Sequence, residues 1–270
     1  MEMHLAGKCA LVTGSSSGLG AAIAKELAAE GVWVAVHGRD RERAENTARE
    51  IERAGGKTPL IIVGDLTDDA EVDAVADSAL ASFGRVDILV NNAGGLVRMD
   101  NPDWSAVTSA DWSHGYRKNV IGALRLIQRF VPGMQARGWG RIVNISSIAG
   151  SHIVGSQIDY GASKAALNNM TVGLAKVLGK SGITVNAISP GTMLTPAVDR
   201  WLVTLRGQHG WSSDLAENEK RYTTELFPQA IPRLGKPREI ATLVTYVASP
   251  NSGYMTGAYI RVDGGFGCAV

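Results

Sequence analysis

The sequence predicts an α/β fold in which one parallel β-sheet is covered by helices on both faces. Short runs of apolar and β-branched residues alternate with longer, alanine-rich amphipathic stretches, and this alternation is typical of right-handed strand–helix–strand units. The runs at 60–63 and 88–90 are apolar throughout, as strands buried on both faces of a sheet are. A glycine cluster directly follows the first run, where such folds bring the backbone close to a bound phosphate.

Seven strands and six helices follow from this alternation. The predicted strands lie at residues 9–12, 32–37, 59–63, 86–91, 141–145, 183–188 and 258–262, and the predicted helices at 19–30, 41–54, 69–83, 118–137, 160–179 and 237–248. No linker or low-complexity stretch interrupts the pattern. We therefore expect a single doubly wound domain over residues 1–270.

Residues 192–232 interrupt the alternation of strands and helices, because they contain no predicted strand and few other regular elements. The segment holds four aromatic side chains, Trp201, Trp211, Tyr222 and Phe227. Segments of this length between elements usually act as lids or binding loops. Trp201, Leu202 and Leu205 are spaced to share one face of a helix. We expect a substrate lid here that is mobile without ligands.

The composition limits the choice of partners. The chain of 270 residues carries 27 Lys and Arg against 26 Asp and Glu, without blocks of like charge, so neither nucleic acid nor an anionic membrane is favoured. No run approaches the ~20 apolar residues of a membrane span, and the first eight residues lack a signal-peptide core. We expect a cytoplasmic protein. His37, His114, His152 and His209 show no metal-ligand spacing, so no metal is expected.

Gly14, Gly18 and Gly20 close the first predicted strand and open the first predicted helix. Glycine lets the backbone turn sharply and approach a pyrophosphate, which then lies at the positive end of the helix. A plain tight turn is the alternative for a glycine cluster taken alone, but the strand–turn–helix context favours dinucleotide binding. No Gly-Lys-Ser/Thr follows, so the cluster is not the phosphate loop of nucleotide hydrolases.

Tyr160 and Lys164 lie four residues apart on a predicted helix, so their side chains share one face, with Cβ atoms about 5–6 Å apart. A free tyrosine has a pKa near ~10 and is a poor base at neutral pH. A neighbouring ammonium group lowers that pKa by stabilising the phenolate, which suits general acid–base chemistry. Taken alone, the pair is more typical of an exposed tyrosine and a solvated lysine on an ordinary helix.

With its remaining motifs the chain resembles the short-chain dehydrogenase/reductase family, in particular the 3-oxoacyl-reductase-like members. The motifs are Gly14-x-x-x-Gly18-x-Gly20, Asn91-Asn92-Ala93-Gly94, Asn119, Ser147 thirteen residues before Tyr160, Tyr160-x-x-x-Lys164, Pro190-Gly191 with Thr195, and Val262-Asp263-Gly264-Gly265. They span nearly the whole chain in the family's order. The resemblance implies a Rossmann-type sheet of seven parallel strands in the order 3-2-1-4-5-6-7.

The resemblance also implies a catalytic set. Tyr160 exchanges a proton with the substrate oxygen, and Ser147 polarises that oxygen through a hydrogen bond. Lys164 holds the nicotinamide ribose and tunes Tyr160, while Asn119 anchors a water that relays protons to bulk solvent. Ser146 is the neighbouring alternative, but its spacing to Tyr160 is fourteen residues rather than thirteen, so Ser147 is preferred.

The same resemblance implies the residues that bind the cofactor. They are Gly14, Ser16, Ser17, Gly18, Leu19, Gly20, Arg39, Asp65, Leu66, Asn92, Ala93, Gly94, Tyr160, Lys164, Pro190, Gly191, Met193 and Thr195. Asp65 matches the residue that contacts adenine, and a helix cap is its alternative role.

The end of the second strand decides between NAD and NADP. An NAD enzyme needs a carboxylate that accepts from the ribose 2′-hydroxyl, whereas a 2′-phosphate needs a cation. Gly38 occupies the position of that carboxylate, and Arg39 follows it as a phosphate ligand. Asp40 could be aimed at the ribose by a loop shift, and Ser17 stands where many NADP members have a base. We expect NADP(H) to be favoured over NAD(H).

The sequence thus predicts an NADP(H)-preferring oxidoreductase that moves a hydride between nicotinamide and a carbonyl or secondary alcohol. The alternatives are an NAD-dependent dehydrogenase, a catalytically idle NADP(H) sensor, and a nucleotide-sugar epimerase or dehydratase; members of the last group are generally longer, with a different glycine spacing. The aromatic residues of 192–232 suggest an apolar or ring-bearing small-molecule substrate, or else form the core of the lid. The resemblance implies a homotetramer, with residues 264–270 as a contact.

Overall fold

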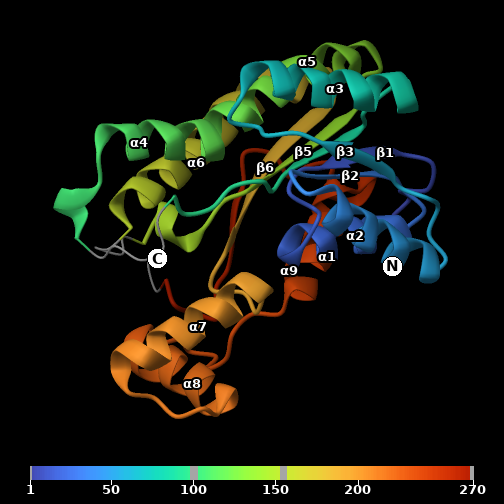
Figure 1. The fold of residues 1–270 in the computed structure, drawn as a ribbon. Helices are drawn as coiled ribbons and strands as arrows, with labels where there is room; N and C mark the ends of the chain where they lie inside the picture. The colour runs from blue at the N-terminus through green and yellow to red at the C-terminus, as the bar shows by residue number, and fades with distance from the viewer. Residues whose placement is uncertain (1, 98–102, 153–156, 268–270) are drawn as a thin grey trace.

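A seven-stranded, all-parallel β-sheet forms the centre of the computed structural model, which describes residues 2–97, 103–152 and 157–267. The strands are β1 (Cys9–Val12), β2 (Trp33–Gly38), β3 (Leu60–Val63), β4 (Ile88–Asn91), β5 (Gly140–Ile145), β6 (Ile183–Pro190) and β7 (Tyr259–Val262). Their spatial order is β3-β2-β1-β4-β5-β6-β7, and Figure 1 shows the sheet at the centre of the fold. The predicted sheet and its strand order are confirmed.

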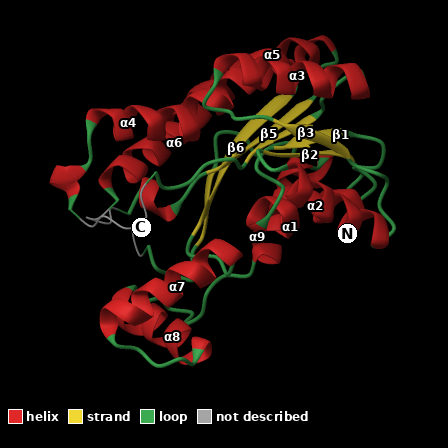
Figure 2. Ribbon diagram, in the orientation of Figure 1, coloured by secondary structure: helices red, strands yellow, loops and turns green. Residues whose placement is uncertain are grey.

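Helices cover both faces of the sheet (Figure 2). One face packs against α1 (Gly18–Ala29), α2 (Arg41–Arg53) and α9 (Pro237–Ala248). The other face packs against α3 (Asp69–Phe83), α5 (Gly122–Ala136) and α6 (Ile158–Leu178). Strands buried from both sides are rich in apolar residues, and this explains why most of their runs can be found in the sequence. No helix in the described part of the chain has the length and apolarity of a membrane span.

The predicted helix at 118–137 is built differently in the structure. A short helix that was not predicted, α4 (Ser109–Tyr116), begins at a capping box between Thr108 and Asp111 and runs into the π-helix η2 (Arg117–Ile121) before α5 starts at Gly122. A Cβ atom on Gly122 would lie 2.7 Å from the Leu66 carbonyl oxygen. The glycine therefore lets this helix pack directly against the loop after β3.

Residues 192–235 form a separate group of helices, here named the helical lobe, which projects from the sheet (Figure 1). It contains α7 (Pro196–His209), α8 (Leu215–Arg221) and a π-helix (Tyr222–Leu226). The expectation of few regular elements was wrong, because these short helices bury their apolar side chains against one another. Their core consists of Leu202, Leu205, Trp211, Tyr222 and Leu234, with Trp201 packed against it. The predicted helical face of Trp201, Leu202 and Leu205 is confirmed.

Candidate active site

Two adjoining cavities lie beyond the carboxyl ends of the strands. The first, about 350 Å³, is lined by the loops after β1, β2 and β3. The second, about 480 Å³, is lined by the loops after β5 and β6, by α6 and by the helical lobe. Asn92, Gly94 and Lys118 line both. Open parallel sheets bind their ligands at this edge.

The glycine loop forms one wall of the first cavity. Gly14 and Gly18 adopt φ of 65° and 56°, a left-handed backbone that favours glycine. A Cβ atom on Gly20 would lie 2.4 Å from the Gly14 carbonyl oxygen, so only glycine permits this tight turn. Helix α1 begins at Gly18, and its unpaired amides and dipole provide a positive end at the cleft.

His37 supports this loop through a hydrogen bond, a role that no sequence motif indicated. The Gly14 N–H donates to His37 Nδ1 at 3.1 Å, so the ring proton belongs on Nε2. Ser15 is bound to the backbone of His37 through both its N–H and its side-chain oxygen. The imidazole is buried, and this burial lowers the pKa of His37 to about 4. It therefore stays neutral under ordinary conditions.

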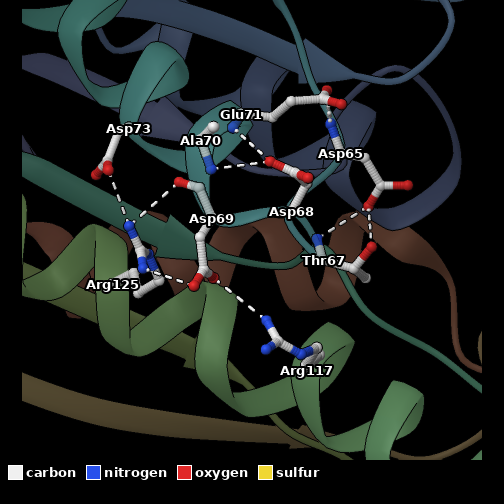
Figure 3. Close-up of polar contacts among 9 residues, drawn as sticks. All are labelled: Asp65, Thr67, Asp68, Asp69, Ala70, Glu71, Asp73, Arg117 and Arg125. Atoms are coloured by element: carbon white, nitrogen blue, oxygen red, sulfur yellow. Dashed lines mark hydrogen bonds and ion pairs between the residues drawn. The ribbon is translucent and has the colours of Figure 1, made fainter. Parts of the chain in front are cut away.

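Arg39 and Asp65 face each other across the first cavity. Arg39 Nη1 lies 3.3 Å from Asp65 Oδ2, and the arginine side chain is 72% exposed. Partial burial acts to raise the pKa of Asp65, but hydrogen bonds from Thr67 and the Arg39 guanidinium hold it below its ordinary value. The alternative role of Asp65 as a helix cap is wrong, because Asp68 caps α3 by accepting from the Ala70 and Glu71 amides (Figure 3).

The residue at position 38 is restricted by the glycine loop. A Cβ atom on Gly38 would lie 2.4 Å from Ser16 Oγ and 2.6 Å from Ser16 Cβ. Asp40, the acid that a loop shift was expected to aim at the ribose, accepts from the Arg43 amide as the N-cap of α2. Position 38 therefore has no side chain, and Asp40 is used as a helix cap. Arg39 remains as the side chain at the end of β2 that can bind a phosphate in this cavity, although it also contacts Asp65.

Tyr160, Lys164 and Ser147 lie together on the wall of the second cavity. Lys164 Nζ donates to the Ile145 carbonyl oxygen at 2.8 Å and lies 5.8 Å from the centre of the Tyr160 ring. Burial raises the pKa of Tyr160, with only the Ser147 hydroxyl acting in the opposite direction. The Lys164 ammonium donates to a backbone carbonyl in this structure, and its lowering of the Tyr160 pKa stays a prediction.

Asn119 lies behind the cavity rather than on its wall. It is buried in the π-helix, where its Oδ1 accepts from the Gly95 amide at 2.8 Å. Its Nδ2 donates to the Gly95 carbonyl and to Ser163 Oγ. Ion pairs hold the π-helix and the start of α5 against α3, because Arg117 and Arg125 both pair with Asp69 (Figure 3). Asn119 thus connects the loop after β4 to the helix that carries Tyr160.

Lys118 is a cation that the sequence analysis did not identify as a site residue. Its Nζ donates to the Leu96 carbonyl at 3.2 Å, and it lines both cavities. Burial and the charge of Arg39 lower the pKa of Lys118. Burial and the charge of Lys118 in turn lower the pKa of Lys164 to about 8. Its position directly before Asn119 was the only available signal.

The other predicted residues also gather at the cleft. Every one lines a cavity except Gly18, Gly20 and Asn119. Thr13 Oγ1 accepts from the amides of Asn92 and Ala93, which fixes the loop after β4 against the glycine loop. Thr195 caps α7 at the entrance to the lobe. Among the described residues, no group of three or more His, Cys, Asp or Glu side chains is arranged to hold a metal.

The cleft fits a dinucleotide. A Cβ atom on Gly94 would lie 2.6 Å from Asn119 Oδ1 and 3.3 Å from Lys164 Nζ, so glycine lets the loop after β4 lie close to both side chains. The first cavity offers amides and cations, as phosphates require. The second presents Tyr160 and Lys164 together with mostly apolar side chains. A family model for short chain dehydrogenases matches residues 8–204.

The chain belongs to the short-chain dehydrogenase family. It is 34% identical over 268 residues to a 3-oxoacyl-[acyl-carrier-protein] reductase of Thermotoga maritima, covering 97% of this chain and 99% of the relative. The resemblance to 3-oxoacyl reductases is therefore confirmed. Family membership makes the protein an NAD(P)-dependent oxidoreductase acting on hydroxyl or carbonyl groups.

Two solved structures are similar over nearly the full length. L-sorbose reductase from Gluconobacter frateurii, solved with NADPH and L-sorbose, has a TM-score of 0.93 and 34% identity, with 100% of both chains covered. A 7α-hydroxysteroid dehydrogenase, solved with NADH and a 7-oxo bile acid, has a TM-score of 0.83 and 32% identity, with 98% and 96% covered. Relatives of similar fold thus bind either cofactor.

Proposed function

We propose that this protein is an NADP(H)-preferring oxidoreductase that interconverts a carbonyl compound and a secondary alcohol, with Tyr160 as the general acid and base. The observation that carries the proposal is the position of Tyr160, Ser147 and Lys164 on one cavity wall, beside a second cavity walled by the glycine loop. A catalytically idle sensor would have no need to keep these three groups together.

The chain's own residues position the substrate and move the proton. Ser147 and Tyr160 donate hydrogen bonds to the substrate oxygen, which gains negative charge during reduction. Because burial raises the pKa of Tyr160, its phenol is protonated at neutral pH and can donate a proton to that oxygen. A bound nicotinamide supplies the hydride. Lys164 holds the nicotinamide ribose, and Asn119, fixed between Gly95 and Ser163, anchors a water that relays protons to solvent.

The preference for NADP(H) rests on the end of β2. Glycine at position 38 leaves no carboxylate to accept from a ribose 2′-hydroxyl, and the exposed Arg39 guanidinium lies in the same cavity. A phosphate there would compete with Asp65 for this guanidinium. NAD(H) remains the alternative. Asp65 favours it, because this carboxylate already neutralises part of the Arg39 charge that would attract a 2′-phosphate.

We also infer a single domain, a cytoplasmic homotetramer and a lid function for the helical lobe. Exposed apolar side chains on α6, Val172 at 38% and Val177 at 74%, support an assembly. Light scattering coupled to size-exclusion chromatography should give four times the chain mass of 28.5 kDa. A single chain mass would contradict the assembly and leave the proposed chemistry unchanged.

The experiment for the proposed function is a cofactor oxidation assay. NADPH and NADH are each incubated with the protein and a panel of carbonyl compounds, and absorbance at 340 nm is followed. We expect carbonyl-dependent oxidation that is faster with NADPH. Tight NADPH binding without turnover of any carbonyl or alcohol would instead support the idle sensor.

A further inference from the structure

Four aromatic rings form a continuous wall on the lobe side of the second cavity. This aromatic wall consists of Trp201, Tyr222, Phe227 and Phe266, all of which line the cavity. Tyr222 contacts Trp201 edge-on, with ring centres 5.2 Å apart, and lies 5.0 Å from Phe227. Phe227 lies 5.8 Å from Phe266. The wall therefore joins α7, the end of the lobe and the C-terminal segment.

Apart from the indole N–H of Trp201 and the hydroxyl of Tyr222, the wall consists of ring carbon. Tyr222, the one member with a hydroxyl, shares a hydrogen bond of 2.9 Å with Thr192 Oγ1. Burial raises the pKa of Tyr222 to about 12, so it stays un-ionised. Aromatic faces and edges attract other rings in offset or edge-to-face geometry. Because the wall lines the same cavity as Tyr160 and Ser147, a ring held against it belongs to the molecule whose carbonyl those two residues contact.

The charged side chains that line the second cavity are each bound to a backbone carbonyl. Among the described lining residues, only Lys118 and Lys164 are charged. Lys164 is directed at the Ile145 carbonyl and Lys118 at the Leu96 carbonyl. The other polar side chains of the lining are neutral and include the amides of Gln157 and Gln229. Among the residues that the structure describes, a substrate carboxylate placed against the aromatic wall would find no cationic partner, and losing its hydration there is costly.

We propose that the substrate is an uncharged carbonyl compound, or the corresponding alcohol, whose reacting carbon lies in or next to a ring. The ring packs against the aromatic wall, and neutral polar substituents hydrogen-bond to Gln157 and Gln229. This inference rests on the proposed function, because it assumes that Tyr160 acts on the bound carbonyl. It goes further by excluding two classes, the open-chain sugars and the carboxylate-bearing oxo acids, as preferred substrates.

The test compares three carbonyl compounds at saturating NADPH: 1-tetralone for the ring class, L-sorbose, with kcat/KM expressed per concentration of its open-chain keto form, for the open-chain sugars, and pyruvate for the oxo acids. We expect kcat/KM for 1-tetralone to exceed both others by about tenfold or more, as rejection of uncompensated polar groups implies. A preference for L-sorbose or pyruvate overturns the substrate class and leaves the proposed function standing. Turnover of none of them or of a wider carbonyl panel, with NADPH bound, overturns the proposed function instead.

Two variants connect the preference to the wall. Phe227→Leu and Phe266→Leu keep an apolar side chain but remove the ring. Each should lower kcat/KM for 1-tetralone by roughly threefold to tenfold, the size of an aromatic pair contact, and change the value for acetone little. Tyr254→Leu is the matched control, because Tyr254 is fully exposed and lies outside the cavity. Equal losses for both ketones, or no loss for 1-tetralone in either variant, would overturn the role of the wall.

Discussion

Replacing Arg39 with alanine should weaken NADPH binding about tenfold and leave NADH binding nearly unchanged. A charge-assisted hydrogen bond contributes about 1.5–3 kcal/mol. The arginine side chain is 72% exposed and already lies 3.3 Å from Asp65, so solvent screening and this competing carboxylate place the effect at the lower end. At about 1.4 kcal/mol per decade, the expected loss is close to one order of magnitude. NADH lacks the 2′-phosphate and loses no such contact.

Inverting the preference requires a further change that only the structure reveals. Aspartate at position 38 would offer a carboxylate to the ribose 2′-hydroxyl, but its Cβ would lie 2.6 Å from Ser16 Cβ. Gly38→Asp alone should therefore displace the glycine loop and weaken both cofactors. The triple variant Ser16→Gly, Gly38→Asp, Arg39→Ala relieves this overlap and should prefer NADH. Ser16→Gly alone is the matched control and should keep the NADPH preference.

The assay is a fluorescence titration of Kd for both cofactors, together with kcat/KM for each, across the wild type and these variants. Equal weakening of NADPH and NADH by Arg39→Ala would refute the phosphate contact. A Gly38→Asp variant that binds NADH well with Ser16 intact would refute the steric argument. A wild-type preference for NADH would refute the proposed cofactor while leaving the fold and the catalytic residues as described.

Three further predictions concern pH and motion. The pKa of His37 is about 4 in the folded protein and near ~6.5 in the unfolded chain. Because the unfolded chain then binds the additional proton, the free energy of unfolding should fall by up to about 3 kcal/mol as pH drops from 6.5 to 4. Urea unfolding measures this fall, and His37→Asn should remove it. Lys118→Gln should raise the pKa of Lys164 above about 8 and move the alkaline limb of the kcat/KM profile upward, while Lys118→Arg should not. Hydrogen exchange across 192–235 should slow when NADPH and substrate bind, as in a gating lid.

Each of these has a clear opposing result. An acid-induced loss of stability that is the same in wild type and His37→Asn would exclude His37 as its source. An unchanged pH profile in Lys118→Gln would show that Lys118 does not act on Lys164. Equal exchange rates in the lobe with and without both ligands would contradict the lid function.

The sheet was predictable because its sequence signals are local. The central strands are buried on both faces and are therefore rich in apolar residues, and helices of regular length separate the strands along the chain. The short helix α4 lacks such a pattern, since only Gly115 is buried in it. The helices of the lobe bury their side chains mainly against each other rather than against the sheet. The strand–helix alternation of the sequence therefore could not predict them.

The composition of the site was predictable from motifs, but its electrostatics were not. The pKa of Tyr160 depends on how deeply the ring is buried and on where the Lys164 ammonium points, and both are consequences of tertiary packing. The same holds for His37 beneath Gly14 and for Ser16 against Gly38, which come together only when β1 and β2 pair. Residue spacing along the chain carries no information about such contacts.

The most direct test of the central claim is the turnover of a Tyr160→Phe variant. This change removes only the phenolic hydroxyl, so the cavity and the cofactor contacts should be kept. General acid–base catalysis contributes about 10²–10⁴-fold, so kcat should fall by at least about a hundredfold while the Kd for NADPH stays within about twofold of wild type. Tyr254→Phe, at a fully exposed site, should change neither value. A Tyr160→Phe variant that retains most of its kcat would contradict the account.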